Sequence, residues 1–533
     1  MASAKVVERF SKYQILQFFF TCLPAVFNSM SNVNFVFVAG DLNYRCRVPE
    51  CEKSFQKFSP TWWPNTVTDR CTKPILNDSW NNVCTNTSFV DKVEICTEWI
   101  YETNNTVIAQ LDLACQPIKA NMIGTIHNIA MAISMLLAGW IADRIGRKPT
   151  LIICSTSIFL GIFKTFTSSY YVYLSLEFLE SIMSGGVITA GLVLMIETCG
   201  RNKRVLSGVL FAYSIYLGEV IFACVAMAVS NWKNLIYIVY APTILFLLYI
   251  PITKESLRWL IVNNKIDAAK DIVKTIIKMN KLDMDPKEID KMDTDTLKIK
   301  CDVETYELKE GLIDALKCRE IVKRLIVATF CRFTVCFIYY GLTVNSVMLP
   351  GNKYTNFLLT SLMSFPGDFL CMILMNRFGR RPPLIYGYAI AAVTCVLFAL
   401  VSEELNWLKI TFYLISKLVI AACYTGVVTY IMELFPTSVR ASLLGLCILT
   451  ASAGTTLAPL TPALSAISPI LTSAIFGISC LISSLLLFLT PETSTMQLVD
   501  TIEQLEAMGQ LKQNKKHPEG RDNSCFDNSV ENL

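Results

Sequence analysis

The 533-residue sequence has few charged residues: they make up 17% of the chain, whereas soluble domains usually carry about 25%. Its formal net charge is only +4, so the chain as a whole does not attract a polyanionic partner. Hydrophobic residues account for 53% of the sequence, far more than a disordered chain contains. The composition therefore excludes a disordered protein and a nucleic-acid-binding protein.

The sequence also lacks the residue patterns of enzymes and cofactor sites. It has two histidines, no phosphate-binding glycine loop, and no cysteine pair at zinc-ligand spacing in the segments expected in the cytosol. His517 lies in a polar tail. His127 lies in a hydrophobic run, where we interpret it as a buried, hydrogen-bonded histidine in preference to a proton carrier. We therefore predict no enzymatic activity, no metal and no cofactor.

Long apolar runs recur from Ile15 to Leu489, and each is long enough to cross a hydrocarbon core of about 30 Å. The first run is longer than the apolar part of a signal peptide and no small-residue cleavage site follows it, so we expect it to remain in the protein. The spacing predicts an all-α, polytopic membrane protein with twelve transmembrane helices, near residues 15–38, 120–141, 150–168, 171–195, 207–230, 234–252, 325–347, 355–375, 383–401, 408–432, 441–464 and 469–490. The eleventh span contains Pro459 and Pro462 and is expected to be bent.

The positive charges orient these spans, because cytoplasmic loops are rich in lysine and arginine. Such residues follow the second, fourth, eighth and tenth spans: Arg144, Arg147 and Lys148, then Arg201, Lys203 and Arg204, then Arg377, Arg380 and Arg381, and finally Arg440. Both termini are therefore expected in the cytoplasm, with the protein in the plasma membrane.

The segment between the first two spans is then extracellular. It contains six cysteines, which predict a disulfide framework whose pairing stays open: Cys46, Cys51, Cys71, Cys84, Cys96 and Cys115. It also contains three acceptor sites for N-linked glycans, at Asn77, Asn86 and Asn104. A second polar segment, 253–323, has apolar residues at helical spacing and is expected to form a cytoplasmic helical linker.

We divide the chain accordingly. The predicted parts are a cytoplasmic N-terminus (1–14), the first transmembrane helix (15–38), the extracellular loop (39–119), helices 2–6 (120–252), the cytoplasmic linker (253–323), helices 7–12 (324–490) and a cytoplasmic tail (491–533).

The two groups of spans repeat each other's motifs. The run from Asp143 to Pro149 is echoed 233 residues later from Asn376 to Pro382, and Glu197 with Arg204 is echoed 236 residues later by Glu433 with Arg440. Glu255 is echoed 237 residues later by Glu492. The chain is therefore predicted to consist of two six-helix halves.

These repeated residues all lie on the cytoplasmic side, where we expect them to form a gate that latches the halves together. Gly139 is expected to allow close helix approach, Asp143 to pair with nearby arginines, and Arg147 and Lys148 to reach acidic partners such as Glu197. The predicted gate comprises Gly139, Asp143, Arg144, Gly146, Arg147, Lys148, Glu197, Arg204, Glu255, Asn376, Arg377, Gly379, Arg380, Arg381, Glu433, Arg440 and Glu492.

The repeated Asp143-Arg144-Ile145-Gly146-Arg147-Lys148 resembles the loop motif of the major facilitator superfamily. Further motifs are similar to those of its organic cation/anion/carnitine transporter family, the insect-type organic cation transporter-like proteins most of all. They are Cys96-Thr97-Glu98-Trp99-Ile100-Tyr101, Leu111-Asp112-Leu113-Ala114-Cys115, Glu255-Ser256-Leu257-Arg258-Trp259-Leu260, Tyr339-Tyr340-Gly341-Leu342, Glu433-Leu434-Phe435-Pro436-Thr437-Ser438-Val439-Arg440 and Pro491-Glu492-Thr493.

The resemblance implies secondary transport of small organic ions by alternating access, through a site between the halves. Two acidic positions of the family's cation carriers fall on Ser364 and Ser452 here, so that site cannot be transferred directly. We hypothesise that Asp368 and Glu219, on different halves, supply the missing charge and offer a choice between a proton and an organic cation. The predicted substrate-binding residues are Glu219, Tyr340, Asn345, Ser364, Asp368, Tyr424 and Ser452.

We single out six ionisable residues within the spans: Glu177, Glu180, Glu219, Arg332, Asp368 and Lys417. Four acids against two bases predict a negative interior, which suits a cation. For Glu177, Glu180 and Arg332, the alternative to a role in binding is that they pair with one another or reach towards the membrane surface.

Organic cations are therefore the expected substrates, with the lipid bilayer as surroundings and a proton or a counter-substrate as a candidate coupling partner. Three alternatives remain open: a carrier of zwitterions or anions such as carnitine-like compounds, a sensor built on a transporter fold, and, least supported, a membrane enzyme.

Overall fold

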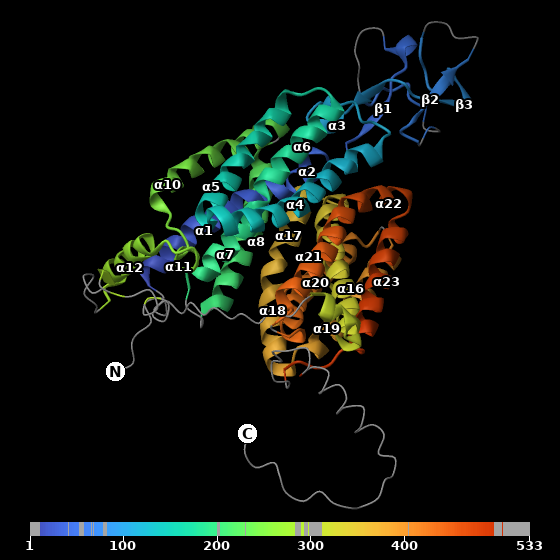
Figure 1. The fold of residues 1–533 in the computed structure, drawn as a ribbon. Helices are drawn as coiled ribbons and strands as arrows, with labels where there is room; N and C mark the ends of the chain where they lie inside the picture. Colours follow the sequence, from blue (N-terminus) through green and yellow to red (C-terminus); the bar gives the residue numbers. More distant parts are fainter. Residues whose placement is uncertain are drawn as a thin grey trace, which may run out of the picture.

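The computed structural model describes residues 11–494, with gaps at 41, 53–57, 65–66, 68, 78–82, 200–202, 230, 283–288, 291, 293–296, 298–311, 403 and 437, and also residue 504. Its helices form two bundles, one from each half of the chain, and a small β-containing segment projects from one end (Figure 1). We call the end with this segment the outer side and the opposite end the inner side.

Within the described residues, eleven helices are long and apolar enough to cross a membrane, and they correspond to the second to twelfth predicted spans. The first half contains α1 (Lys12–Val33), α2 (Phe35–Val38), α4 (Pro117–Ile145), α5 (Arg147–Ser157), η2 (Ile158–Phe166), α6 (Tyr170–Ser184), α7 (Gly186–Glu197), α8 (Arg204–Ala228), α9 (Trp232–Tyr240), η4 (Ala241–Leu248) and α10 (Tyr249–Ile252).

The first predicted span, 15–38, corresponds to α1 and α2. Helix α1 is long enough to cross a membrane, but it is not among the eleven apolar helices, and it carries buried polar residues such as Gln17, Asn28 and Ser29. Ser29 joins neighbouring helices, because it donates a hydrogen bond to the Ile215 carbonyl of α8, 2.7 Å away. Helix α1 therefore belongs to the bundle, packed against α7 and α8.

The second half repeats this arrangement. It contains α16 (Arg319–Asn345), η5 (Ser346–Met348), α17 (Lys353–Leu362), α18 (Ser364–Phe378), α19 (Arg381–Leu400), α20 (Asn406–Leu434), α21 (Arg440–Leu457), η6 (Ala458–Leu460), α22 (Thr461–Ile467) and α23 (Pro469–Leu487). The eleventh span breaks as predicted, because the α-helix ends at Leu457 and a 3-10 turn with Pro459 follows.

The outer segment is held together by the six predicted cysteines, which pair as Cys46–Cys96, Cys51–Cys84 and Cys71–Cys115. The two small antiparallel sheets of this outer segment were not predicted from the sequence. Strand β1 (Tyr44–Cys46) pairs with β4 (Trp99–Tyr101), and β2 (Thr72–Leu76) pairs with β3 (Phe89–Ile95). The segment also has two short helices, η1 (Pro49–Cys51) and α3 (Val107–Gln110). The three glycan-acceptor asparagines are exposed.

The linker between the halves is helical where it is described, with α11 (Leu257–Val262), α12 (Ile266–Asn280) and α15 (Leu312–Lys317). Helix α12 packs on the inner end of α1, where Asn280 accepts a hydrogen bond from the Tyr13 backbone N–H at 3.0 Å. Helices α11 and α12 thus belong structurally to the first half, whereas α15 packs against α16 of the second half.

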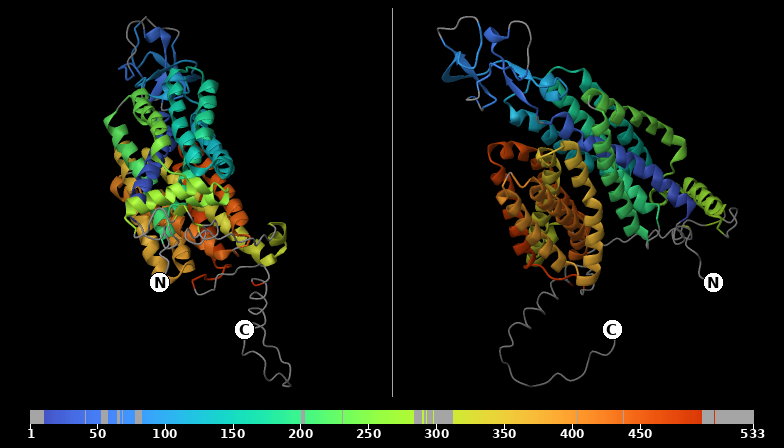
Figure 2. Two further views of the ribbon diagram at one scale, coloured as in Figure 1. Left: turned by 60° about the vertical axis from the view of Figure 1, so that its left-hand side comes forward. Right: turned by 180° about the vertical axis from the view of Figure 1, so that it is seen from behind.

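The two halves meet at their outer ends. The Phe37 ring of α2 lies 5.2 Å from the Tyr354 ring and 5.0 Å from the Phe357 ring, both on α17. Gly124 of α4 lies so close to η6 that an added Cβ would stand 2.9 Å from Pro459. The inner ends of the two bundles diverge in the right-hand view of Figure 2. This arrangement is closed on the outer side.

Candidate functional site

Aromatic side chains from both halves meet around the middle of the interface between them. Tyr213 and Tyr216 of α8 pack against Phe365 of α18, with ring centroids 5.3 and 5.6 Å apart. On the second half, Tyr339 lies 5.4 Å from Tyr340 and 5.1 Å from Tyr424 by ring centroids. The structure therefore brings residues up to 211 positions apart in sequence, Tyr213 and Tyr424, into one aromatic group, which we call the central aromatic cluster.

Asp368 stands beside this cluster. The carboxylate is buried, with 6% of the residue exposed, accepts a hydrogen bond from the Thr425 hydroxyl of α20, and interacts with Tyr216 across the interface. No basic side chain among the described residues forms an ion pair with it within 4 Å. A buried carboxylate without a base is unfavourable unless a cation or a proton accompanies it.

Glu219 of α8 differs from Asp368, because a lysine accompanies it across the interface. Its charge interacts with that of Lys417 on α20, and both side chains are buried. Lys417 Nζ donates hydrogen bonds to Thr343 Oγ1 at 2.7 Å and to the Tyr339 carbonyl at 3.2 Å. This long-range pairing does not appear in the sequence, where neither residue has a charged neighbour.

The other predicted substrate residues separate into two groups. Tyr340, Tyr424 and Ser364 belong to the central region, where Ser364 Oγ lies 2.9 Å from the Tyr339 hydroxyl. Asn345 lies at the outer end of α16 instead, bonded to Thr461 Oγ1 at 2.6 Å. Ser452 donates to the Ile448 carbonyl of its own helix at 3.0 Å. The structure thus unites five of the seven predicted residues in one region.

Arg332 also lies next to the central aromatic cluster. Its guanidinium stands 4.6 Å from the centroid of the Tyr424 ring and donates to the Tyr424 carbonyl at 3.4 Å. The alternative that Arg332 pairs with Glu177 and Glu180 is therefore wrong, since those carboxylates lie on α6 in the other half and have a different partner.

That partner is Lys164 of η2, which the sequence analysis overlooked. Its Nζ lies 2.8 Å from Glu177 Oε2 and 3.4 Å from Glu180 Oε2, and the lysine is fully buried. His127 Nδ1 lies 2.8 Å from Glu177 Oε1. Lys164 adds a third base to the interior, so the predicted excess of acids over bases is smaller than the sequence indicated. In the sequence, only the position of Lys164 near the end of the third predicted span indicated a buried base.

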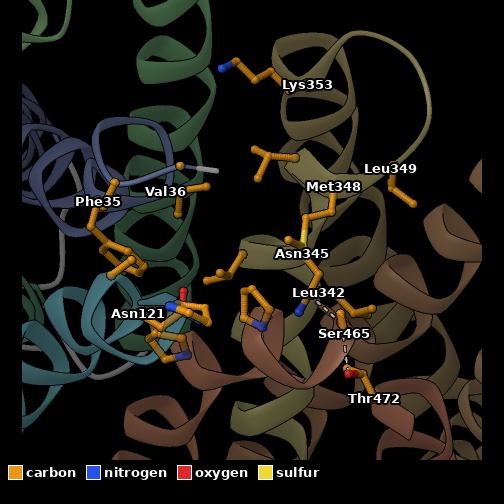
Figure 3. A pocket seen from close by; sticks show the side chains of 18 of the residues that line it. Phe35, Val36, Asn121, Leu342, Asn345, Met348, Leu349, Lys353, Ser465 and Thr472 are labelled. Atoms are coloured by element: carbon orange, nitrogen blue, oxygen red, sulfur yellow. Dashed lines mark hydrogen bonds between the residues drawn. The ribbon is translucent and has the colours of Figure 1, made fainter. Parts of the chain in front are cut away.

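A cavity of about 1030 Å³ opens between the halves on the outer side. Figure 3 shows Phe35, Val36 and Asn121 of the first half facing Asn345 and Ser465 of the second half across it. Residues of the outer segment, Asp69 to Cys71, also line this cavity. It can serve as an outer vestibule that leads towards the interface.

On the inner side, the repeated motifs build the same structure twice. Glu255 Oε1 accepts hydrogen bonds from the backbone N–H groups of Arg147 and Lys148, at 3.0 and 3.1 Å, where α5 begins. Glu492 does the same for Arg380 and Arg381, at 2.8 and 2.9 Å, where α19 begins. Each carboxylate therefore satisfies the free donors of a helix N-terminus and complements its dipole.

The backbone conformation before each of these helices requires a glycine. Gly146 has φ +116° and Gly379 has φ +90°, both in the region that other residues rarely adopt. An added Cβ on Gly146 would stand 2.2 Å from Glu255 Oε2, and one on Gly379 would stand 3.1 Å from the Glu492 carboxyl carbon. Glycine is needed at these two positions, but not at Gly139, whose added Cβ would meet only Thr189 at 3.9 Å. The expected close approach at Gly139 is wrong.

The arginines of the predicted gate bind within their own halves. Arg147 pairs with Asp143 at 2.8 Å and with Glu197 at 3.3 Å, and Arg380 pairs with Glu433 at 3.1 Å. Lys148 Nζ donates to the Ile250 carbonyl at 2.7 Å, so its expected acidic partner is replaced by a carbonyl. In this outer-closed arrangement these contacts stabilise each half separately, and the latch between halves stays a prediction.

The remaining gate residues sit near helix ends. Arg144 stacks on Trp140 at 4.2 Å, and Arg377 lies 5.6 Å from the Phe378 ring. Arg381 donates to the Leu487 carbonyl at 3.0 Å, and Arg440 to the Phe435 carbonyl at 3.0 Å. Asn376 is exposed, and the side chain of Arg204 lies outside the described residues.

The comparisons with known proteins agree with this architecture. The family model described as "Sugar (and other) transporter" matches residues 91–504. The Organic cation transporter protein of Drosophila melanogaster is 26% identical over 517 residues, covering 94% of this chain and 93% of that protein. Solute carrier family 22 member 3 of Rattus norvegicus is 28% identical over 418 residues, covering 77% and 74%.

Solved structures of the xylose transporter XylE from E. coli are similar in fold. The inward open conformation superposes with a TM-score of 0.58 at 14% identity, covering 93% of this chain and 99% of that chain. The structure described as a proton:xylose symporter bound to 6-bromo-6-deoxy-D-glucose has a TM-score of 0.58 at 16% identity, covering 93% and 100%. The predicted major facilitator fold is confirmed.

Proposed function

Because the chain belongs to the sugar (and other) transporter family, within the major facilitator superfamily, it is a secondary transporter, and we propose that it carries small organic cations. The relatives named as organic cation transporters support this substrate class. Alternating access would proceed by rocking of the two halves around the interface between them.

The observation that carries the proposal is the position of Asp368. It is a buried carboxylate at the interface, with a threonine and a tyrosine as partners and no basic residue in an ion pair with it among the described residues. An organic ammonium ion supplies the missing positive charge. Glu219 is less suited to this role, since its charge interacts with that of Lys417 across the interface.

The central aromatic cluster suits the rest of such a substrate. Tyr213, Tyr216 and Phe365 offer ring faces beside Asp368. Each ring that faces an alkylammonium group contributes about 0.5–2 kcal/mol, depending on how completely water is removed. Carboxylate and rings together favour an organic cation over a metal ion or a strongly hydrated one.

A zwitterion is the second candidate, and Arg332 is the observation that favours it. Arg332 stacks on Tyr424. The charge of Asp368 also acts on the hydroxyl of this tyrosine. A substrate with both an ammonium and a carboxylate group would find opposite charges on either side of this tyrosine.

An uptake screen in oocytes tests the substrate class. The probes are radiolabelled tetraethylammonium, carnitine and p-aminohippurate, which are a cation, a zwitterion and an anion, at two external pH values. We expect uptake of the cation, and its loss in Asp368→Asn at unchanged surface expression. Asp267→Asn, at an exposed carboxylate of α12, is the control. Wild-type uptake in Asp368→Asn would contradict the proposed site, and uptake of the anion alone would contradict the substrate class.

The proposal includes a plasma-membrane location with both termini in the cytoplasm. The disulfide-linked outer segment and its three exposed acceptor asparagines support an extracellular position for that segment. A mobility shift on glycosidase treatment, absent from the variant with Asn77, Asn86 and Asn104 all changed to Gln, is the expected result. Antibody access to a terminal tag without permeabilisation would contradict the orientation.

A further inference from the structure

The buried charges of the first half form a closed group away from Asp368. Glu177 and Glu180 of α6 surround Lys164 Nζ, and His127 of α4 contacts Glu177. Tyr240 and Tyr173 lie near the lysine, and Ser184 donates to Glu180 Oε1 at 3.1 Å. All four ionisable residues are buried, with exposed fractions of 3% or less. Carboxylates are rarely buried without a compensating positive charge, so the charges and protons of this group must balance.

The hydrogen-bond partners of His127 indicate its protonation state. Nδ1 lies 2.8 Å from Glu177 Oε1 and 2.7 Å from Ser181 Oγ, and Nε2 lies 3.0 Å from Asn32 Oδ1. Ser181 already donates its own hydroxyl hydrogen to the Glu177 carbonyl at 2.7 Å, so its oxygen is an acceptor towards His127. With Asn32 Oδ1 towards Nε2, both ring nitrogens face acceptors, an arrangement that the doubly protonated imidazolium satisfies.

The charge count agrees with this geometry. With His127 protonated, two positive groups, His127 and Lys164, balance the two carboxylates Glu177 and Glu180. Without that proton the two ionised carboxylates exceed the single lysine, and the buried group is neutral only if one of the carboxylates carries the proton instead. From the elements around α4, the ionisable side chains that act on this group are Glu177, Glu180 and Lys164, with the hydroxyls of Tyr173 and Tyr240.

A metal ion is a weaker explanation of the same group. The ligand atoms of His127, Glu177 and Glu180 lie within 4.8 Å of one another, which a metal ion would accept. However, Lys164 Nζ already binds both carboxylates at 2.8 and 3.4 Å and would repel a second cation. The proton is the cation that this group can still gain or lose.

The Phe35 ring lies next to both the buried group and the outer cavity. The Phe35 ring lies 6.1 Å from the His127 ring and also lines the cavity (Figure 3). Phe35 is packed against Gly124, where an added Cβ would stand 2.5 Å from its ring, and Pro459 of the second half contacts the same glycine. The contact that closes the outer ends of the halves therefore also holds Phe35 in place.

We propose that His127, with Glu177, Glu180 and Lys164, forms a proton-binding site whose occupancy favours the outer-closed arrangement. The bound proton lets His127 bond at once to Asn32 of α1 and Glu177 of α6, which ties α4 to two neighbouring helices. Loss of the proton breaks one of these bonds. When the halves separate at Pro459, Phe35 is freed and His127 can return its proton to water in the cavity.

The site lies about 15 Å below the outer end of α4, because His127 is ten residues from Pro117 and a helix rises about 1.5 Å per residue. It is thus near mid-membrane but in the first half, whereas Asp368 lies on the second. Coupling of this proton to substrate movement rests on the proposed transport function; proton binding itself does not.

The first experiment reads the proton directly. The chain has only two histidines, so protein labelled with 15N-histidine and reconstituted in nanodiscs gives signals from His127 and from His517 of the tail. At ~pH 7 we expect His127 to show two protonated ring nitrogens, and to lose one in Glu177→Gln. His127→Gln assigns the signals. A neutral His127 in the wild type would overturn the proposal.

The second experiment reads the conformational consequence. Asn121→Cys places a reporter on the wall of the outer cavity, and its labelling rate with a charged thiol reagent measures opening on that side. Raising the pH from ~6 to ~8 should increase that rate at least several-fold, because proton loss releases the outer-closed arrangement. The change should vanish when His127→Gln is added and persist when His517→Gln is added.

These readouts need no substrate, so they separate the two proposals. An imidazolium at His127 with a pH-dependent labelling rate supports the proton site even if no organic cation is taken up. A pH-independent labelling rate in the wild type, or an equal dependence in His127→Gln, would overturn the link between the proton and closure.

Discussion

At the residue scale, the buried charges of this protein are paired far more completely than their sequence positions indicate. Lys164 forms ion pairs with two carboxylates on another helix. The charge of Lys417 interacts with that of Glu219 across the interface. Most of the buried ionisable residues, though not Lys164, were identified from the sequence, because charge in an apolar run is conspicuous. The sequence could not identify their partners, because Lys164 stands at the edge of a predicted span and contacts Glu177 only after helices pack.

We expect the Lys164→Met variant to be strongly destabilised. Removing one member of a buried ion pair leaves an uncompensated charge and typically costs about 3–5 kcal/mol. The thermal unfolding midpoint in detergent should fall clearly, whereas Lys278→Met, at an exposed lysine of α12, should leave it unchanged.

Neutralising the carboxylates supplies the converse check on Lys164. Adding Glu177→Gln and Glu180→Gln to Lys164→Met should recover part of the lost stability, since no buried charge then lacks a partner. Equal stability of wild type and Lys164→Met would show that the lysine does not compensate these carboxylates.

At the element scale, the internal repeat has a definite structural role. In each half a glutamate from beyond the last helix receives the backbone donors at the start of the third: Glu255 caps α5, and Glu492 caps α19. The repeat was visible in the sequence because these contacts demand the same residues at the same spacing. What the sequence could not supply is the conformation in which they act, so contacts expected between the halves occur within each half.

Glu492 makes this capping dependent on pH. Burial alone would raise the pKa of Glu492, but the backbone N–H groups of Arg380, Ser494 and Arg381 outweigh it and lower the pKa below its usual value. A lowered pKa means that the folded state favours the charged form. The stabilisation is therefore complete above the usual glutamate pKa of about 4.3 and is lost as the pH falls through the lowered value.

The expected result is a difference in unfolding midpoint between wild type and Glu492→Gln that is constant near neutral pH and shrinks on acidification below about pH 4.3. Glu404→Gln, at an exposed glutamate, is the matched control and should match the wild type throughout. A wild-type advantage over Glu492→Gln that grew on acidification would contradict the assignment.

At the scale of the whole molecule, two bundles meet at their outer ends and hold between them, at Asp368, a buried carboxylate that forms no ion pair with a base among the described residues. The sequence predicted the helical class, the two halves, eleven of the spans by position and the six cysteines that form disulfides. These features depend on local composition and spacing. The disulfide pairing and the separation of Asn345 from Asp368 depend on how distant segments pack, which no single segment encodes.

The central claim is that an organic cation binds at Asp368 between the halves. Its most direct test is saturable binding of radiolabelled tetraethylammonium to the purified protein in nanodiscs, measured for the wild type, Asp368→Asn and the control Asp267→Asn. We expect binding in the wild type and the control, and a loss of affinity of at least tenfold, or about 1.4 kcal/mol, in Asp368→Asn. Equal affinity in the wild type and Asp368→Asn would contradict this claim.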